Sequence, residues 1–437
     1  MAQGSGPSFT RLFAGVLVAL KLKESFDDYS KVATEEDGRV PLASTGYRDV
    51  DSDAESARLL ETEAGTARPT RRKTGCCVCC GLDCTLFWKA FAIVLTVFAA
   101  WNAFRLIRWA VTPAPTGLEH MPVFSDSLGC LNAEYIFNGQ PTSFNVPIGS
   151  VFADHGFDIR GGAVGTIVVL EGAPTATMMK YEISLRTNNR KLLDTMSLEH
   201  AAEKDAPVRD SHLRVTTGHP DKDSCIRFDI RIFIPPTLQK LHVAAHAVAH
   251  VQFDPVSFIH LDEFYTTLFT TNHQNMIIPH NNLRARIIGL EVFDGWIVGD
   301  VSVDETTKVT TQRGAGIMNV RVHPIPASDP ANPTVASLRT TSGSGRTDVY
   351  YIDQDAHVHR PMNNMHLSSM NADMYFTYRD SHYRGRVELV SKSYSATGLQ
   401  RVDGGGTDEN KWTHWYGDVN GTDEIMVRSR GWVGVYF

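Results

Sequence analysis

The sequence is poor in several features that would point to a soluble enzyme or to a nucleic-acid-binding protein. Its 437 residues contain no G-x-S-x-G nucleophile motif, no P-loop and no dinucleotide fingerprint. Positive charge is not in excess, because the formal net charge is -7. The C-terminal part also lacks a basic patch with interleaved aromatic residues, so no nucleic-acid partner is expected. No cofactor and no resident metal is predicted.

Long hydrophobic runs are also scarce, and the one that stands out is Ala90–Phe104, which has no ionisable side chain. A helix needs about 20 apolar residues to cross a bilayer core. The run reaches that length when it is extended to residues 85–111, because Lys89 can direct its amine toward the headgroups. We therefore predict one transmembrane helix there, with a buried helix of a soluble core as the alternative.

The flanking charges favour a cytosolic N-terminus, since more Lys and Arg residues precede the run than follow it. This signal-anchor topology predicts a single-pass protein of the plasma membrane or an endomembrane, in contact with the lipid bilayer. A shorter apolar stretch, Leu12–Leu20, cannot span a membrane and is interpreted as a surface-associated segment. A cleaved signal peptide is the alternative for it, and would reverse the topology.

Cysteine is concentrated at the membrane entry, where five of the seven cysteines precede the apolar run. Juxtamembrane cysteines on the cytosolic side are typical palmitoylation sites, whereas a zinc site usually has two separated ligand pairs. We predict lipidation, with zinc binding and unmodified thiols as alternatives, at Cys76, Cys77, Cys79, Cys80 and Cys84. The other two, Cys130 and Cys225, could form one disulfide if the C-terminal part lies in an oxidising compartment. Asn420 is the candidate glycosylation acceptor.

Residues 1–84 form the N-terminal region, in which Glu24–Glu63 is acidic and has few large apolar side chains. Such a segment cannot bury enough surface to offset the conformational entropy lost on folding, so we predict a disordered cytosolic tail. Within it, Glu55, Leu59 and Leu60 resemble an acidic dileucine sorting signal, and Tyr29 and Tyr47 begin tyrosine-based patterns. Chance matches are the alternative for all of these patterns.

Beyond the apolar run, residues 112–150 are expected to form a linker and the first strands, and residues 151–437 a large β-rich domain. Cys225–Ile234 alternates apolar and polar side chains, which is the period of a strand with one buried face. The prolines that follow end this strand, because proline cannot donate to a ladder. Helix signals are few, and one short helix is predicted within Asp262–Asn275.

A loose repeat runs through this domain. Each unit is a short alternating stretch, a glycine-bearing bend and a second alternating stretch, as in Lys308–Val322, Ser337–Tyr351 and Ile425–Phe437. Units of this kind cannot each bury a face alone and must stack. The fold prediction is therefore mainly β, an irregular β-solenoid or elongated β-sandwich, preceded by one transmembrane helix and a disordered tail.

This order of tail, cysteine-rich membrane entry, single span and β–glycine–β units resembles fungal single-pass membrane proteins that carry an adhesin-like β-solenoid domain of uncharacterised function. The likeness covers residues 151–437, with Arg401–Trp415 as an interruption of the repeat. The resemblance implies an elongated surface displayed for binding. It transfers no catalytic residue, because the family has none established.

Three histidines, His242, His246 and His250, recur at every fourth residue of one predicted strand. On a helix this spacing would bring them together to bind a metal. On a strand it would place neighbours about 13 Å apart on one polar face, and we predict the strand. The pair His357 and His359 is likewise interpreted as surface histidines rather than as metal ligands.

Asp221 and Asp223 form a D-x-D pair, which in type II membrane glycosyltransferases holds a divalent ion. However, the βαβ alternation of those enzymes is absent, and the pair lies in a turn between predicted strands. The leading prediction is a non-enzymatic protein that displays its β domain on the lumenal or extracellular side to bind a cell-wall glycan or a protein. The alternative is a type II secretory-pathway enzyme acting on glycans. The oligomeric state is left open.

Aromatic residues gather near the C-terminus of the chain. We interpret them as a cap of the β core, and the alternative is a surface on which sugar rings stack. These residues are Trp412, Trp415, Tyr416, Trp432 and Tyr436.

Overall fold

Two compact units divide the chain, residues 1–115 and residues 116–437. The structure is a computed structural model that describes residues 15–16, 18–19, 22–23, 78–79, 82–111, 116–202, 206–312, 314–353, 359–406 and 411–437. Most of the predicted tail lies outside these residues, as do Glu55, Leu59 and Leu60. Of the segment Leu12–Leu20, only residues 15–16 and 18–19 are described, and they are helical.

The first unit contains the predicted apolar helix. Helix α2 (Cys84–Val111) follows a short antiparallel pair, β1 (Val78–Cys79) and β2 (Leu82–Asp83). Within α2, Phe87–Arg108 has a mean hydropathy of 1.8 and only 11% of its most apolar window is buried. It is the one helix of the described residues that is long and apolar enough to cross a membrane. Because its apolar side chains are exposed, it does not fit the alternative of a buried core helix.

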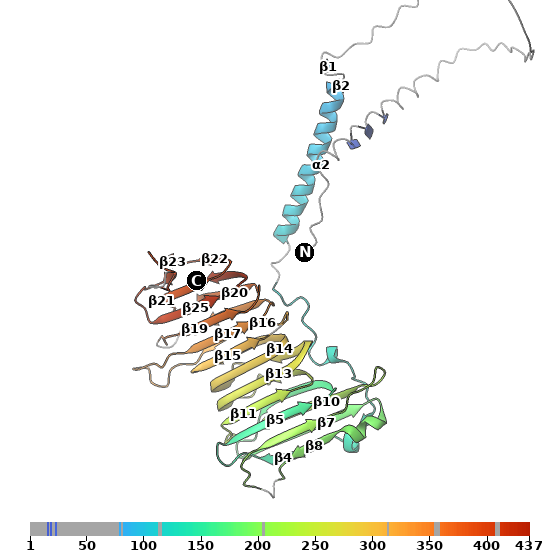
Figure 1. Ribbon diagram of the computed structural model, residues 1–437, viewed down its shortest axis with the longest axis vertical. Coiled ribbons are helices and arrows are strands. Elements are labelled where there is room, and N and C mark those ends of the chain that lie inside the picture. Colours follow the sequence, from blue (N-terminus) through green and yellow to red (C-terminus); the bar gives the residue numbers. More distant parts are fainter. Residues whose placement is uncertain are drawn as a thin grey trace, which may run out of the picture. The chain divides into compact units, whose positions relative to one another are not determined.

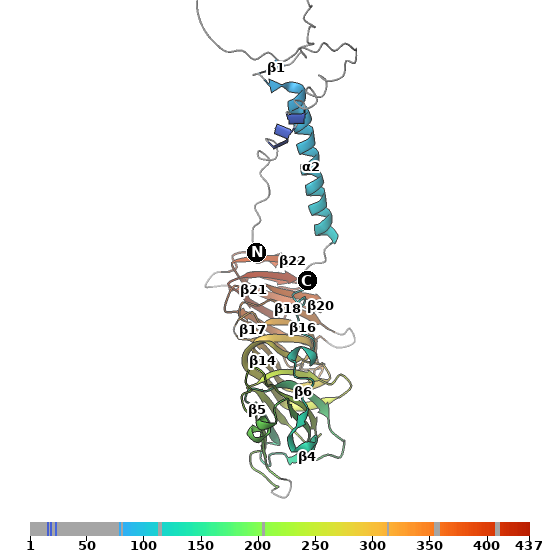
Figure 2. The ribbon, with the colours of Figure 1, turned by 90° about the vertical axis from the view of Figure 1, so that its right-hand side faces the viewer.

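The second unit is a stack of two-stranded rungs, in which each strand pairs in parallel with the strand above and the strand below it. Figures 1 and 2 show the rungs in order, from the green strands near β4 to the red strands near β22. Because successive strands of a rung lie on different faces, the unit is a β-solenoid with two faces. The mainly β prediction is therefore confirmed, and the glycine-bearing stretches of the repeat are its rungs.

Face one carries the first strand of each rung. In stacking order it consists of β9 (His212–Thr216), β5 (Asp154–Arg160), β11 (Lys240–Ala245), the first parts of β13 (Ile259–Ile278) and β14 (Leu283–Val303), β15 (Thr306–Thr311), β17 (Ser337–Ser342), β19 (Asn363–Ser368), β25 (Asp423–Arg428) and β21 (Gly385–Val390).

Face two carries the second strand of each rung. In the same order it consists of β10 (Ile226–Ile234), β6 (Val164–Glu171), β12 (Val248–Phe253), the second parts of β13 and β14, β16 (Ile317–Pro324), β18 (Thr347–Ile352), β20 (Met374–Asp380), β26 (Trp432–Tyr436) and β22 (Ser393–Thr397).

Antiparallel strands extend the faces at both ends of the stack. At one end these are β7 (Met178–Thr187), β4 (Thr142–Pro147) and β3 (Tyr135–Ile136) beside β10, and β8 (Ser197–His200) beside β9. At the other end they are β24 (His414–Tyr416) and β23 (Gln400–Arg401) beside β21. Within the described part of the connections there are three short 3-10 helices, at Asp126–Leu128, Phe137–Gly139 and Arg190–Thr195.

The core lies between the two faces and is built from every second residue of each strand. On β10, for example, Phe228, Ile230 and Ile232 are buried while Arg231 is exposed. Burial of each such side chain contributes about 1.5–3 kcal/mol relative to exposure. The alternation of buried and exposed positions along each strand thus explains the alternation of apolar and polar residues in the sequence.

The predicted short helix within Asp262–Asn275 is wrong. This segment belongs to β13, where Phe264, Thr266 and Leu268 are fully buried at alternate positions. Strands β11 and β14 pair with β13 on its two edges, so a helix would leave both ladders open. Tertiary pairing therefore decides the conformation of a segment whose local signals are ambiguous.

A segment before the first rung, here called the strap (residues 116–131), lies along face two of the solenoid. The buried Arg227 side chain donates to the carbonyl oxygens of Ser125 and Gly129 at 3.1 and 2.9 Å. The amide of Ser125 donates to Nδ1 of His250 at 2.9 Å. The strap is therefore held by polar contacts from strands β10 and β12.

Candidate functional site

A cluster of aromatic side chains lies on the outward side of face two, near the C-terminal end of the stack. We call it the aromatic platform and define it by Tyr350 of β18, Tyr375 of β20, and Trp432 and Tyr436 of β26. These strands are neighbours, with Tyr350 paired to Thr377 and Tyr375 paired to Gly434. The platform side chains occupy the positions that alternate with buried residues such as Phe376, so they point away from the core.

The rings of the platform converge over a glycine. A Cβ atom at Gly434 would lie 2.6 Å from the indole ring of Trp432 and 2.6 Å from the hydroxyl of Tyr436. The ring centroids of Tyr375 and Trp432 are 4.8 Å apart at an interplanar angle of 51°. The missing side chain at Gly434 therefore allows Trp432 and Tyr436 to fold inward and form one surface with Tyr375.

The Arg346 cation contacts the platform beside β18. The guanidinium of Arg346 lies 4.1 Å from the ring centroid of Tyr375, and it donates to both carboxylate oxygens of Asp348 at 2.6 and 2.8 Å. Burial raises the pKa of Asp348, and the Arg346 cation only partly offsets that effect. This ion pair, in which Asp348 is buried and Arg346 half-buried, orients Tyr375 through a cation–π contact.

Hydroxyl groups border the platform on its other side. Strand β22 pairs with β26 and carries Ser393, Ser395 and Thr397, all of which are exposed. Aromatic faces bind apolar CH groups, and their Tyr and Trp polar atoms remain free to hydrogen-bond. Together with the hydroxyl row, the platform suits a ligand that presents CH faces and hydroxyl edges, as sugars do.

The C-terminal aromatic residues, which form one group in the sequence, lie in two different places. Trp412 and Trp415 lie at the C-terminal end of the stack, where the ring of Trp412 contacts the Arg386 and Lys411 cations. Trp432 and Tyr436 lie on face two instead. The sequence did not separate the two groups, because nothing in it shows that β26 enters the stack beside β20.

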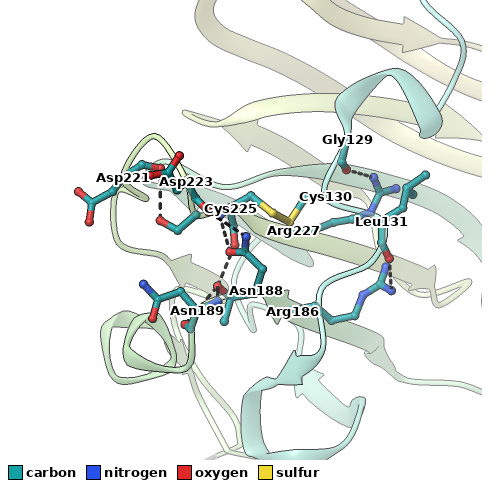
Figure 3. Close-up of a disulfide and its surroundings, with 12 residues drawn as sticks. Gly129, Cys130, Leu131, Arg186, Asn188, Asn189, Asp221, Asp223, Cys225 and Arg227 are labelled. Carbon is teal, nitrogen blue, oxygen red and sulfur yellow. Dashed lines mark hydrogen bonds between the residues drawn. A yellow bond between two sulfur atoms is a disulfide. The ribbon is translucent and has the colours of Figure 1, made fainter.

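The two remaining cysteines lie together in the second unit. Figure 3 shows the disulfide between Cys130 of the strap and Cys225 at the start of β10, with a Cα–Cα distance of 5.9 Å. Asn188 accepts from the amide of Cys225 at 2.8 Å, which positions the turn before β10. Arg186 donates to the carbonyl oxygen of Leu131, next to the disulfide, at 3.4 Å.

Asp221 and Asp223 lie in the turn that precedes this disulfide (Figure 3). Both side chains are exposed, and their carbonyl oxygens accept from Ser224 and Asn188. Across the residues with described positions, no group of three or more His, Cys, Asp or Glu side chains could hold a metal ion. The glycosyltransferase-like alternative therefore gains no support from the surroundings of this pair.

The prediction that His242, His246 and His250 share one polar strand face is wrong. Strand β11 ends at Ala245, and the chain turns a corner before β12 begins at Val248. His250 is consequently buried on face two, where burial lowers its pKa to about 4. His242 and His246 remain on the outward side of face one.

The other predicted site residues are dispersed. His359 is half-buried and contacts the buried Asp423 at 2.9 Å, whereas His357 lies outside the described residues. Asn420 is exposed in the turn before β25. In the cysteine cluster, Cys79 lies in β1 and Cys84 begins α2. The other three cysteines lie outside the described residues, namely Cys76, Cys77 and Cys80.

Comparisons with known proteins add little. No family model matches the sequence, and no curated protein matches it. A crystal structure of a candidate cell adhesion protein from Clostridium sporogenes aligns with 68% of this chain and 99% of its own length. The identity is 9% and the TM-score is 0.20, so this likeness carries no argument about fold or function.

Proposed function

We propose that the chain is a single-pass membrane protein that displays its β-solenoid on the lumenal or extracellular side and binds a glycan polymer through the aromatic platform, without catalysing a reaction. The observation that carries the proposal is the convergence of Tyr375, Trp432 and Tyr436 over Gly434. Trp and Tyr are enriched among the residues that dominate binding energies. A flat face of stacked strands lets several sugar units of one polymer bind in a row.

Two further features support the topology. Helix α2 has the length and apolarity of a membrane span. The disulfide between Cys130 and Cys225 is typical of a domain that folds in an oxidising compartment. The exposed Asn420 would be available for glycosylation there.

Protease protection on sealed microsomes tests the topology. With a tag at each end of the full chain, the N-terminal tag should be digested and the C-terminal tag protected. The Asn420→Gln variant should migrate faster than the wild type, because it lacks one glycan. Digestion of the C-terminal tag in sealed vesicles would refute the proposed side.

Sedimentation with insoluble polysaccharides tests the ligand. Full-length protein in detergent should sediment with β-glucan or chitin. Trp432→Ala with Tyr436→Ala should weaken this binding at least about tenfold, since truncating a Trp or Tyr that dominates an interface costs about 2 kcal/mol or more. Trp415→Ala is the matched control, because Trp415 belongs to the end of the stack rather than to the platform. Equal losses in both variants would contradict a role of the platform.

A further inference from the structure

A second surface, on face one, lies near the opposite end of the solenoid from the platform. Strands β9, β5 and β11 are neighbours there, and Gly156 pairs with His212 on one side and with His242 on the other. Gly156 and Ala244 carry little or no side chain, so they form the floor of a groove of about 300 Å³. We call it the basic groove and define it by its polar lining, Asp158, Arg160, His212, Arg214, His242 and His246.

Positive charge predominates in the basic groove. Its lining holds two arginines and one aspartate, which gives a formal charge of +1 when the three histidines are neutral and +4 when they are protonated. Glu199 of β8, which is not part of the lining but lies 3.6 Å from Arg214, lowers this sum by one. Asp158 accepts from Nε of Arg160 at 2.7 Å and lies 3.7 Å from Nε of Arg214. Asp158 therefore orients both guanidinium groups, and Arg214 also pairs with Glu199.

Both arginines of the basic groove are partly exposed. The side chains of Arg160 and Arg214 are 53% and 41% exposed. Nε of Arg214 is buried and lies 3.7 Å from Asp158, so a ligand would contact the terminal nitrogens of the guanidinium groups. Planar guanidinium groups are suited to bidentate contact with a carboxylate or sulfate group.

An aromatic rim completes the basic groove. The rings of His246 and Phe269 stack with centroids 4.3 Å apart and an interplanar angle of 2°. Phe293 of the next rung continues this row, with its centroid 5.8 Å from that of Phe269. The rim gives a ligand an apolar surface directly beside the cations.

The three histidines make the charge of the groove depend on pH. Burial lowers the pKa of His242, and the nearby carboxylates of Asp158 and Glu291 partly offset this. The charged or titratable groups that face the histidines are Asp158 and Arg160 on β5, Arg214 on β9, Glu199 on β8, Tyr265 on β13 and Glu291 on β14, and the buried His155 lies behind His212. Acid pH therefore adds positive charge to the groove.

We infer that the basic groove binds an acidic oligosaccharide, whose carboxylate or sulfate groups contact Arg160 and Arg214 while a sugar ring packs against the rim of His246 and Phe269. Binding should strengthen as the pH falls, because protonated histidines add attraction for the anion. The inference rests on the proposed glycan-binding role for the class of ligand. It uses a different surface from the aromatic platform, so the two can fail separately.

Calorimetry on the full-length protein in lipid nanodiscs tests this inference, with hexagalacturonate as the probe. We expect binding at pH 5.5 that is about tenfold weaker at pH 7.5, and that weakens further with added salt. Arg160→Gln with Arg214→Gln should reduce the affinity at least about tenfold, since two charge-assisted contacts are lost. Replacing His212, His242 and His246 together by glutamine should abolish the pH dependence of the affinity.

Matched probes and variants separate the outcomes. The control Arg321→Gln removes an exposed arginine paired to Asp300 on face two, and it should leave the affinity unchanged. Trp432→Ala should also leave hexagalacturonate binding unchanged, whatever it does to neutral glycans. Equal affinity for the fully methyl-esterified probe would overturn the anionic ligand, and equal affinity for hexaglutamate would overturn the sugar. Unchanged melting temperatures would show that each variant is folded.

Discussion

At both ends of the solenoid, one rung is inserted out of sequence order between two others. The two ends differ in the contacts that hold this inserted rung. At one end, β5 and β6 lie between the rung β9–β10 and the rung β11–β12, although they precede both in the chain. At the other end, β25 and β26 lie between β19–β20 and β21–β22, although they follow both. The central rungs from β13 to β20 stack in sequence order.

The difference lies in when the inserted rung becomes available and in what holds it. At the first end, the inserted rung is an early part of the domain, and later rungs add on both sides of it. The disulfide between Cys130 and Cys225 holds the neighbouring strap. At the second end, the inserted rung comes last, so the rung β21–β22 can reach its final place only when β25–β26 has entered. Non-covalent contacts alone hold it among the described residues.

Deletion of Asp423–Phe437 should have the largest effect, because it removes strands with neighbours on both edges. Ile425, Val427, Val433 and Val435 are fully buried, and their combined loss should destabilise this end by more than about 5 kcal/mol. We expect β19–β24 to lose protection from hydrogen exchange while β5–β12 keep theirs. This result would show that the two ends of the solenoid differ in local stability.

Val419→Ala is a suitable control, since Val419 is exposed in the turn before β25, and its exchange pattern should match that of the wild type. If the deleted protein instead kept full protection at β21 and β22, this rung would be able to dock directly on β19–β20. The inserted rung would then not be required for the order of the stack.

Replacing both Cys130 and Cys225 by serine should have the next largest effect, at the opposite end. The bond closes a sequence separation of 95 residues, for which the expected loss of stability is about 3–4 kcal/mol. Hydrogen exchange should rise in the strap and at the start of β10, and it should stay unchanged from β19 to β26. A reductant should reproduce this in the wild type and have no further effect on the double variant. Increased exchange at the C-terminal end would contradict independent ends.

Much of this fold could be predicted from the sequence, because strand alternation is a local property. Cys225–Ile234 was recognisable as a strand from its period alone, and it is β10 from Ile226 onward. The segment Asp262–Asn275 was not, since its strand identity comes from pairing with β11 and β14. The stacking order at the two ends was hidden for the same reason: each inserted rung has the same local pattern as the central ones.

The candidate sites were less predictable than the fold. Trp432 and Tyr436 were visible as part of an aromatic group, but Tyr375 joins them only through the pairing of β20 with β26. The basic groove joins β5, β9 and β11, which are far apart in the chain. A single sequence contains no sign of which histidine or arginine of one rung lies beside which residue of the next.

The smallest of the expected effects concerns the ion pair that holds the inserted C-terminal rung. Asp423 is fully buried at the start of β25 and accepts from the amides of Met362 and Arg384 at 3.1 and 2.6 Å. Its contact with His359 raises the pKa of that histidine above the ordinary value. A raised histidine pKa contributes stability that is fully present below about pH 6.5 and is lost as the pH rises through the raised value.

His359→Gln should therefore destabilise the C-terminal end by about 1–2 kcal/mol near pH 6 and by less near pH 8.5. Denaturant unfolding of both proteins at a series of pH values measures this difference. Burial lowers the pKa of both His155 and His366 to about 3, so these groups make the wild type and the variant alike less stable in acid. The difference between the two unfolding free energies removes this shared effect and isolates the contribution of His359. The exposed His260 provides the control His260→Gln, for which the difference should be near zero at every pH. A His359→Gln difference that does not change with pH would mean that the side chain packs at this end without contributing charge.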